Sequence, residues 1–407
     1  MEHYRDRQED SVGTRMLLIL IAWSLLISSC HDIPVAPGQT VDEQFHVPRV
    51  NRTVSDVKRD GTTRAAEESI RVDSRHDLLY LTFVDSLHGW FADTNEAVFR
   101  TVDGGLNWRR LRVPLQPNAE ITGLTFFDRA SGWITVRETH RPGTDFTNRI
   151  LGTTDGGESW TVQSSEINRA ISAIRFVDKK IGWAAGTKIV REPSLYGDLL
   201  VLSTEDGGET WADRSKGVSS FSEHDTSNMQ DVVDLGVTNH NSVRILTGDN
   251  RIIETHDGGL NWRLVDRLDP GNKSLHFVLK PDGHLSIVAG VDGKEGMSAS
   301  YFIKQLDGSW DERVLSPIYL KDAVHLTNDR VFACGSILPK DYQTGRDDNR
   351  RFGVVVYSSD GGKNWRVIYE NKRVPRINAI SLAGSEKLFL AGDGGTVAFL
   401  DLQKAGL

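Results

Sequence analysis

The string TVDGGLNW, at Thr101–Trp108, decides the fold of this chain because it recurs along the sequence. Four further full copies are TTDGGESW at Thr153–Trp160, TEDGGETW at Thr204–Trp211, THDGGLNW at Thr255–Trp262 and SSDGGKNW at Ser358–Trp365. A shorter copy, LDGSW, stands at Leu306–Trp310. The shared aspartates are Asp103, Asp155, Asp206, Asp257, Asp307 and Asp360, which lie 52, 51, 51, 50 and 53 residues apart. A repeat of nearly constant length close to 50 residues indicates a solenoid or a propeller.

Each repeat also contains the strands of a propeller blade. A run such as LTFVD at Leu81–Asp85 leads to the Gly-Trp pair at Gly89–Trp90, a third apolar run precedes the Asp string, and a fourth follows it. Four short strands per repeat match one blade. A closing unit with runs at 377–381, 387–390 and 396–400 adds a seventh. The sequence therefore predicts an all-β, seven-bladed propeller with four-stranded blades over residues 67–407.

The closing unit has three strands and no Asp string, so its outer edge needs a strand from elsewhere. The spacing between the Trp of one repeat and the inner-strand Phe of the next, counted back from Phe83, points to a position near Glu67. Ser69–Asp73 then follows with strand-like alternation. We expect residues 67–74 to pair with 396–402 and to close the ring.

The Asp string has a structural explanation that involves no ligand. An Asp in a turn accepts hydrogen bonds from nearby backbone N–H groups, and the glycines supply positive φ. Of the ten Trp residues, Trp23 lies near the N-terminus and the other nine stand at Gly-Trp or Asp-string positions. We therefore expect the six aspartates and these Trp side chains to be structural, with no catalytic residue among them.

The pattern S/T-x-D-x-G-x-x-W resembles the Asp-box, or bacterial neuraminidase repeat. Together with the preceding F-x-D…G-W element, the unit resembles the propellers of the photosystem II stability and assembly factor-like family, over about residues 77–407. This resemblance implies a non-enzymatic platform that binds partner polypeptides. Asp-boxes also occur in sialidases, xyloglucan hydrolases and sortilin-type receptors, so a glycoside hydrolase or carbohydrate-binding propeller is the alternative.

The residues that an enzyme or a metal site would need are not evident in the sequence. A sialidase requires three convergent arginines, a Tyr–Glu pair and an Asp acid, and its Arg-Ile-Pro signature is missing, since His31–Pro34 lacks the Arg. The histidines are scattered without ligand spacing, and Cys334 stands alone. We expect no catalytic residue, no metal and no cofactor.

The N-terminal sequence predicts where the protein is located in the cell. Met16–Ser29 is an uncharged apolar stretch of the length of a signal-peptide core, and Ile27–Cys30 resembles the bacterial lipobox. We expect a signal peptide at 1–29, lipidation of Cys30 and a flexible tether over 30–66. The protein would then be lipid-anchored in the bacterial cell envelope, on the periplasmic face or outer surface. An ordinary secretory signal with an incidental Cys is the alternative.

The charge balance limits the partners. The 407 residues include 48 Lys+Arg and 56 Asp+Glu, for a formal charge of −8, so nucleic acid is not an expected partner. With 38% hydrophobic and 26% charged residues, the chain is an ordinary globular protein, which we expect to be monomeric.

The longest connections predict the binding face. In each blade the turns between the first and second strands and the Asp strings share one face and are short, whereas the other connections vary in length. Insertions in a repeat protein often mark the binding face. The candidate residues there are Arg137, Arg141, Arg191, Tyr196, Tyr342, Arg346, Arg350 and Arg351. We expect a scaffold for protein binding or complex assembly, with an unidentified protein or a cell-surface glycan as partner, whereas the alternative is a solvated rim of mixed charge.

Overall fold

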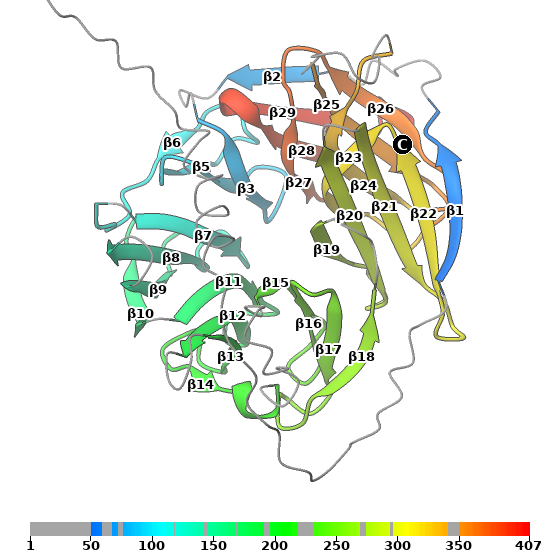
Figure 1. Cartoon of the computed structure of the whole chain (residues 1–407). Helices are drawn as coiled ribbons and strands as arrows, with labels where there is room; N and C mark the ends of the chain where they lie inside the picture. The colour runs from blue at the N-terminus through cyan, green and yellow to red at the C-terminus, as the bar shows by residue number, and fades with distance from the viewer. Residues whose placement is uncertain are drawn as a thin grey trace, which may run out of the picture. The chain divides into compact units, whose positions relative to one another are not determined.

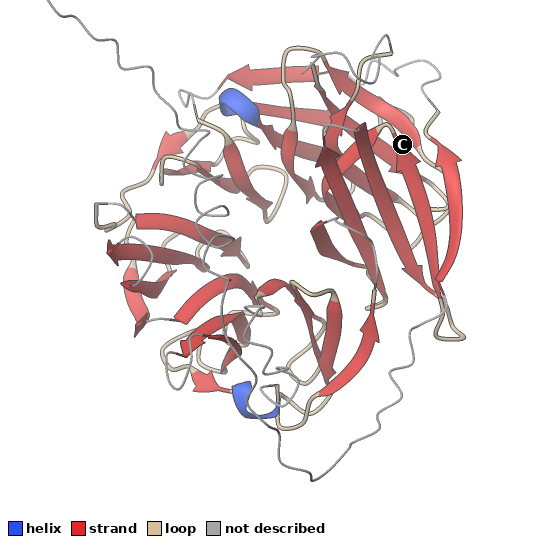
Figure 2. Ribbon diagram, viewed as in Figure 1, coloured by secondary structure: helices blue, strands red, loops and turns tan. Residues whose placement is uncertain are grey.

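The computed structural model describes residues 50–58, 67–71, 76–117, 119–141, 145–167, 169–190, 196–218, 231–268, 274–293, 296–340 and 350–407. Within these ranges the regular structure is almost entirely β-strand, with two short 3₁₀ turns at Ser215–Gly217 and Asp393–Gly395 (Figure 2). No helix among the described residues has the length and apolarity needed to cross a membrane. The expected signal peptide and Cys30 lie outside the described residues.

The strands form seven sheets arranged around a common centre, numbered here as blades 1 to 7 (Figure 1). Blades 1 and 2 contain β3 (Leu78–Phe83), β4 (Gly89–Asp93), β5 (Val98–Thr101) and β6 (Arg109–Arg110), then β7 (Ala119–Phe126), β8 (Gly132–Arg141), β9 (Asp145–Thr153) and β10 (Thr161–Ile167). Blades 3 and 4 contain β11 (Arg169–Phe176), β12 (Gly182–Val190), β13 (Tyr196–Thr204) and β14 (Ala212–Asp213), then β15 (Val232–Val237), β16 (Val243–Thr247), β17 (Arg251–Thr255) and β18 (Arg263–Arg267).

The remaining blades complete the ring. Blades 5 and 6 contain β19 (Ser274–Leu279), β20 (Leu285–Gly293), β21 (Gly296–Lys304) and β22 (Trp310–Ser316), then β23 (Ile318–His325), β24 (Val331–Ile337), β25 (Phe352–Ser358) and β26 (Arg366–Asn371). Blade 7 contains β27 (Ile377–Ala383), β28 (Lys387–Gly392) and β29 (Thr396–Asp401). The innermost strands contact one another in sequence order, and β27 contacts β3. The predicted seven-bladed propeller is therefore confirmed.

Aromatic rings join several neighbouring blades. Phe126 of blade 2 stacks on Trp90 of blade 1 with ring centroids 3.8 Å apart, and it meets Trp160 of its own Asp string edge-on. Phe176 of blade 3 stacks in the same way on Trp133 of blade 2. Such ring pairs contribute about 0.5–1.5 kcal/mol beyond the area they bury. The Phe and Trp of each early repeat therefore hold adjacent blades together.

Blade 7 takes its outer strand from the N-terminal side of the propeller. β2 (Glu67–Arg71) pairs antiparallel with β29, with Glu67 opposite Leu400 and Arg71 opposite Thr396. The expected strand spans 67–74, and its last residues, 72–74, lie outside the described ranges. Through this pairing the two ends of the propeller sequence share one sheet.

The expected tether at 30–66 requires a correction. β1 (Val50–Asp56) is not a free tether but pairs parallel with β22, as a fifth strand of blade 5. Lys58 then forms a parallel bridge with Arg366 of blade 6. The prolines and charges of this stretch do not indicate a strand. The pairing of β1 depends on the edge of β22, which lies far along the chain.

Deleting residues 66–75 should lower the melting temperature of the whole ring. The outer edge of β29 would lose its partner strand, and we expect a decrease on the order of 5 °C. Differential scanning calorimetry measures it, with deletion of the equally long segment 36–45 as the control. A melting temperature that is the same for both deletions and for the intact chain would show that β2 does not stabilise the ring.

Candidate functional site

The propeller has two faces that differ in how their polar groups are used. One face carries the turns between first and second strands and the Asp strings, and we call it the Asp-turn face. The opposite face carries the turns between second and third strands and the connections between blades. This division follows from the antiparallel order of the strands in each blade.

The Asp strings form closed local networks, as blade 2 illustrates. The Thr153 hydroxyl donates to Asp155 Oδ1 at 2.8 Å and accepts the Gly157 N–H at 2.9 Å. Asp155 also accepts the backbone N–H and the hydroxyl of Ser159. Gly156 and Gly157 have φ of +75° and +93°, a region that side chains with a Cβ rarely adopt. The aspartate is thus occupied by its own turn.

The same arrangement recurs in the other copies. The aspartates that accept from the hydroxyl two residues earlier and from the N–H four residues later are Asp103, Asp206, Asp257 and Asp360. In the shorter copy, Asp307 accepts from the N–H and the hydroxyl of Ser309. Although burial raises the pKa of Asp155, hydrogen bonds from Ser159 and Thr153 outweigh it and lower the pKa to about 2.

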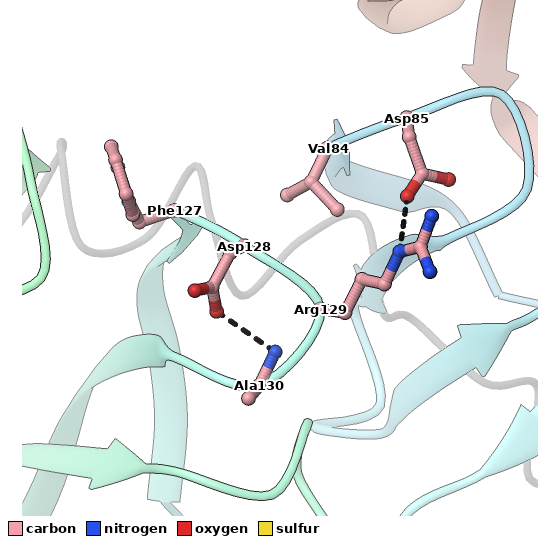
Figure 3. Close-up of a pocket in the computed structure, with 6 residues that line it drawn as sticks. All are labelled: Val84, Asp85, Phe127, Asp128, Arg129 and Ala130. Atoms are coloured by element: carbon pink, nitrogen blue, oxygen red, sulfur yellow. Dashed lines mark hydrogen bonds and ion pairs between the residues drawn. The ribbon is translucent and has the colours of Figure 1, made fainter.

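A shallow groove of about 290 Å³ lies on the Asp-turn face between blades 1 and 2. Figure 3 shows Asp85 facing Arg129, whose Nε lies 2.7 Å from Asp85 Oδ2, while Asp128 accepts the N–H of Ala130 in its own turn. Asp128 also pairs with Lys179 of blade 3 at 2.6 Å. The carboxylates of this groove therefore join consecutive turns around the ring.

A larger cavity, of about 590 Å³, lies on the opposite face. It is lined by the β4–β5 turn and by the segment that begins at the end of β6: Asn95, Glu96, Arg110, Leu111, Arg112, Val113 and Leu115. Leu111 is buried, and its N–H donates to Val98 O at 2.8 Å, which fixes the segment to β5. The arginines on either side of Leu111 are exposed. Within the described ranges neither Arg110 nor Arg112 forms an ion pair.

Glu96 gives this cavity an unusual carboxyl group. Its φ is +55°, a left-handed conformation that is uncommon outside glycine. Asp93 holds the turn by accepting the N–H groups of Asn95 and Ala97, each at 2.9 Å. Burial, and then the charges of Asp93 and Glu120, raise the pKa of Glu96. Backbone strain of this kind is often found at binding sites.

The structure describes the side chains of three of the eight predicted binding residues, Arg137, Arg350 and Arg351, so the predicted binding face stays a prediction. Arg137 lies on β8 and pairs with Glu120 of β7 at 2.6 Å. The backbones of Arg141 and Tyr196 stand at strand ends, whereas Arg191, Tyr342 and Arg346 lie outside the described residues. Arg350 is exposed, Arg351 is half-buried, and both are engaged by neighbouring groups.

Sequence reasoning missed Glu96, Arg110 and Arg112. The signal that could have found the arginines is the run Arg109–Arg112, RRLR, directly after Trp108. The repeat pattern places this run in the fourth strand of blade 1, and the length of the connections points to other loops as the binding face. Strand β6 is only two residues long, so the rest of the run is left to line the cavity.

The chain is similar to known proteins in its sequence and in its fold. No protein-family model matches the chain. The photosystem II assembly lipoprotein Ycf48 of Synechococcus sp. (strain CC9902) is 21% identical over 333 residues, which cover 81% of this chain and 86% of that protein. This chain resembles Ycf48. The predicted resemblance to photosystem II assembly factors is thereby confirmed.

Solved structures agree on the fold. YCF48 bound to D1 peptide matches with a TM-score of 0.58 and 18% identity, over 85% of this chain and 99% of that one. YCF48 from Cyanidioschyzon merolae matches with a TM-score of 0.58 and 16% identity, over 83% and 100%. A GH74 xyloglucanase from Xanthomonas campestris reaches a TM-score of 0.55 at 12% identity, over 83% of this chain and 54% of the enzyme. At these identities the likeness is one of fold.

Replacing Asp155 with Ala should lower the stability of the propeller by about 1 kcal/mol at neutral pH, because hydrogen bonds of the turn are lost. The folded-state pKa of about 2 lies below the usual 3.8, so this contribution is present above pH 3.8 and disappears as the pH falls towards 2. Chemical denaturation at pH 7 and near pH 2 measures the difference between variant and parent. Glu209→Ala, which removes an exposed acid from the equivalent turn of blade 3, is the control. An equal loss of stability in both variants would contradict the special role of the turn aspartate.

Proposed function

We propose that this protein is a lipid-anchored scaffold of the bacterial cell envelope, which holds a segment of a partner polypeptide during complex assembly. The partner binds on the face opposite the Asp turns. The observation that carries this proposal is the cavity of about 590 Å³ beside Arg110 and Arg112. On the Asp-turn face, by contrast, Asp85 and Asp128 of the groove form ion pairs with basic residues of neighbouring turns.

The lining of the cavity fits an acidic segment with apolar neighbours. Arg110 and Arg112 offer guanidinium groups, which bind carboxylates through paired hydrogen bonds. Val113 and Leu115 are half-buried and provide apolar wall beside them. Glu96 lines the same cavity, and burial together with the charges of Asp93 and Glu120 raises the pKa of its carboxyl group. A polypeptide partner is further supported by Ycf48, which is an assembly lipoprotein and whose structure was solved with a D1 peptide.

A binding role fits the cavity better than hydrolysis does. Glycosidases use two carboxyl groups about 5–9.5 Å apart, one on each side of the bond that is cut. Among the described residues that line the cavity, Glu96 supplies the single carboxyl group. The aspartates of the repeats serve their own turns on the other face. We therefore assign the chain a non-enzymatic role.

A photo-crosslinking amino acid at position 113 should capture a discrete partner polypeptide in intact cells. Capture should fall at least about tenfold with Arg110→Ala and Arg112→Ala together, because two charged contacts are lost. Arg109→Ala is the matched control, since Arg109 pairs with Glu158 instead of lining the cavity. The same crosslinker at Phe127, which is 42% exposed in the groove of the Asp-turn face, should capture nothing specific. Equal capture from both positions, or capture unaffected by the arginine variants, would refute the site.

Labelled palmitate should enter the parent protein and be lost with Cys30→Ala. The lipobox-like sequence makes Cys30 the acceptor, and the precursor of the variant should keep its apolar segment. Cys334→Ala removes the other cysteine, which is completely buried in β24, and should keep the label. Labelling that survives Cys30→Ala would rule out this anchor.

A further inference from the structure

Blade 5 carries one strand more than its fold requires. Its four strands β19 to β22 already form a complete antiparallel sheet, as in the other blades. β1 is added outside β22, with Val50 opposite Trp310 and Asp56 opposite Ser316. Figure 1 shows β1 as the outermost strand of this sheet. Among the paired strands of the described residues, this pair alone is parallel.

The side chains of β1 from Val50 to Val54 are exposed to solvent. Val50 is 36% exposed and Val54 is 72% exposed, and the three residues between them are exposed as well. The apolar residues of β22, such as Trp310 and Leu315, are buried within the propeller itself. Burial of these five side chains therefore contributes little to the attachment of β1, which there depends on the backbone pairing with β22, whereas Val57 directly after β1 packs against the apolar core of blades 5 and 6.

One charged contact gives the edge a chemical preference. Arg52 Nε lies 3.3 Å from Glu312 Oε2, and the side chain of Glu312 is only 5% exposed. The other oxygen of Glu312 accepts the Ser300 hydroxyl at 2.5 Å. A carboxylate that is nearly buried at a sheet edge requires a positive charge beside it. A strand seated on β22 with a basic side chain at the position of Arg52 therefore keeps this charged contact with Glu312.

The segment continues along the ring after β1. The Lys58 N–H donates to Trp365 O at 3.2 Å, and the Lys58 carbonyl accepts the Val367 N–H at 3.0 Å. One short stretch of chain thus pairs with the outer edges of blades 5 and 6 through its backbone. Recognition by backbone pairing depends weakly on the sequence of the added strand, apart from its contacts at particular positions.

We infer that the outer edge of β22 is a strand-binding site, which β1 occupies in the free protein. An extended segment of a partner polypeptide, with Lys or Arg opposite Glu312, takes this edge by displacing β1. The site lies on blade 5, whereas the cavity beside Arg110 lies on blade 1, so this inference does not depend on the proposed function of that cavity.

The test uses the full chain and a fluorescein-labelled synthetic peptide with the sequence of residues 50–58, VNRTVSDVK. In the parent chain β1 competes from the same molecule at high effective concentration, so the peptide should bind poorly. Arg52→Glu with Thr53→Pro in the chain should weaken β1 and raise the affinity for the peptide at least tenfold. A peptide with Glu in place of its Arg should not bind, and adding Glu312→Gln to the variant chain should weaken binding again. Fluorescence anisotropy measures all four combinations.

Hydrogen exchange across β3 to β14 checks that the variant chain is folded, and Arg52→Glu alone serves where the double variant fails this check. Equal peptide affinity for parent and variant chains, or none for either, would overturn the inference. So would equal binding of the peptides with Arg and with Glu. If parent and variant chains instead form a dimer that the peptide does not disrupt, the edge serves a second copy of this chain, and the partner strand is excluded.

Discussion

The structure depends on the hydrogen bond that a Trp side chain in each of blades 1 and 2 donates to the Asp turn of the next blade. Trp90 Nε1 donates to Gly156 O at 3.0 Å, and Trp133 Nε1 donates to Gly207 O at 2.9 Å. The turn must therefore come close to the preceding blade. At Gly157 an added Cβ would lie 2.5 Å from Leu111 Cδ1, and its φ is positive. The repeated Asp-Gly-Gly-x-x-Trp string therefore specifies a contact between neighbouring blades as well as a turn.

This constraint separates the two faces chemically. On the Asp-turn face the carboxylates serve the turns and join them, as Asp128 does by accepting its own turn's N–H groups while pairing with Lys179 of the next blade. A substitution there would affect a turn and its neighbour together. The opposite face has no repeated network of this kind in the described residues, so its connections are free to differ in length. Exposed arginines can line a cavity there, as Arg110 and Arg112 do, and within the described residues neither forms an ion pair.

Local signals determined how much could be predicted from the sequence. The Asp turns and the seven blades followed from the repeat, because each turn closes within a few residues. β2 could be predicted by counting residues back from Phe83, since its partner β29 lacked a neighbouring strand in the sequence pattern. β1 was not, because its parallel pairing depends on the edge of β22, about 260 positions later. The cavity was missed for the same reason, because Glu96 and Arg112 come to line one cavity only when the blade is folded.

The blades are joined by different means around the ring, and the N-terminal segment pairs with blades 5 and 6, which are not joined by a stacked Trp–Phe pair. Stacked rings connect blades 7, 1, 2 and 3, through Phe389 on Phe83 and the two Trp–Phe pairs. Between blades 5 and 6 the apolar core includes an edge-on contact of Tyr301 with Trp365, whose ring centroids lie 5.1 Å apart. A polar contact adjoins it, because His325 bridges the Tyr301 hydroxyl at 2.8 Å and Ser286 at 3.3 Å. Burial lowers the pKa of His325 to about 4, so the imidazole is neutral there at physiological pH. β1 and Lys58 pair with the outer edges of these same two blades. The N-terminal segment thus adds backbone pairing to the part of the ring in which an edge-on Tyr–Trp contact and a buried histidine replace the stacked Trp–Phe pairs of the early repeats.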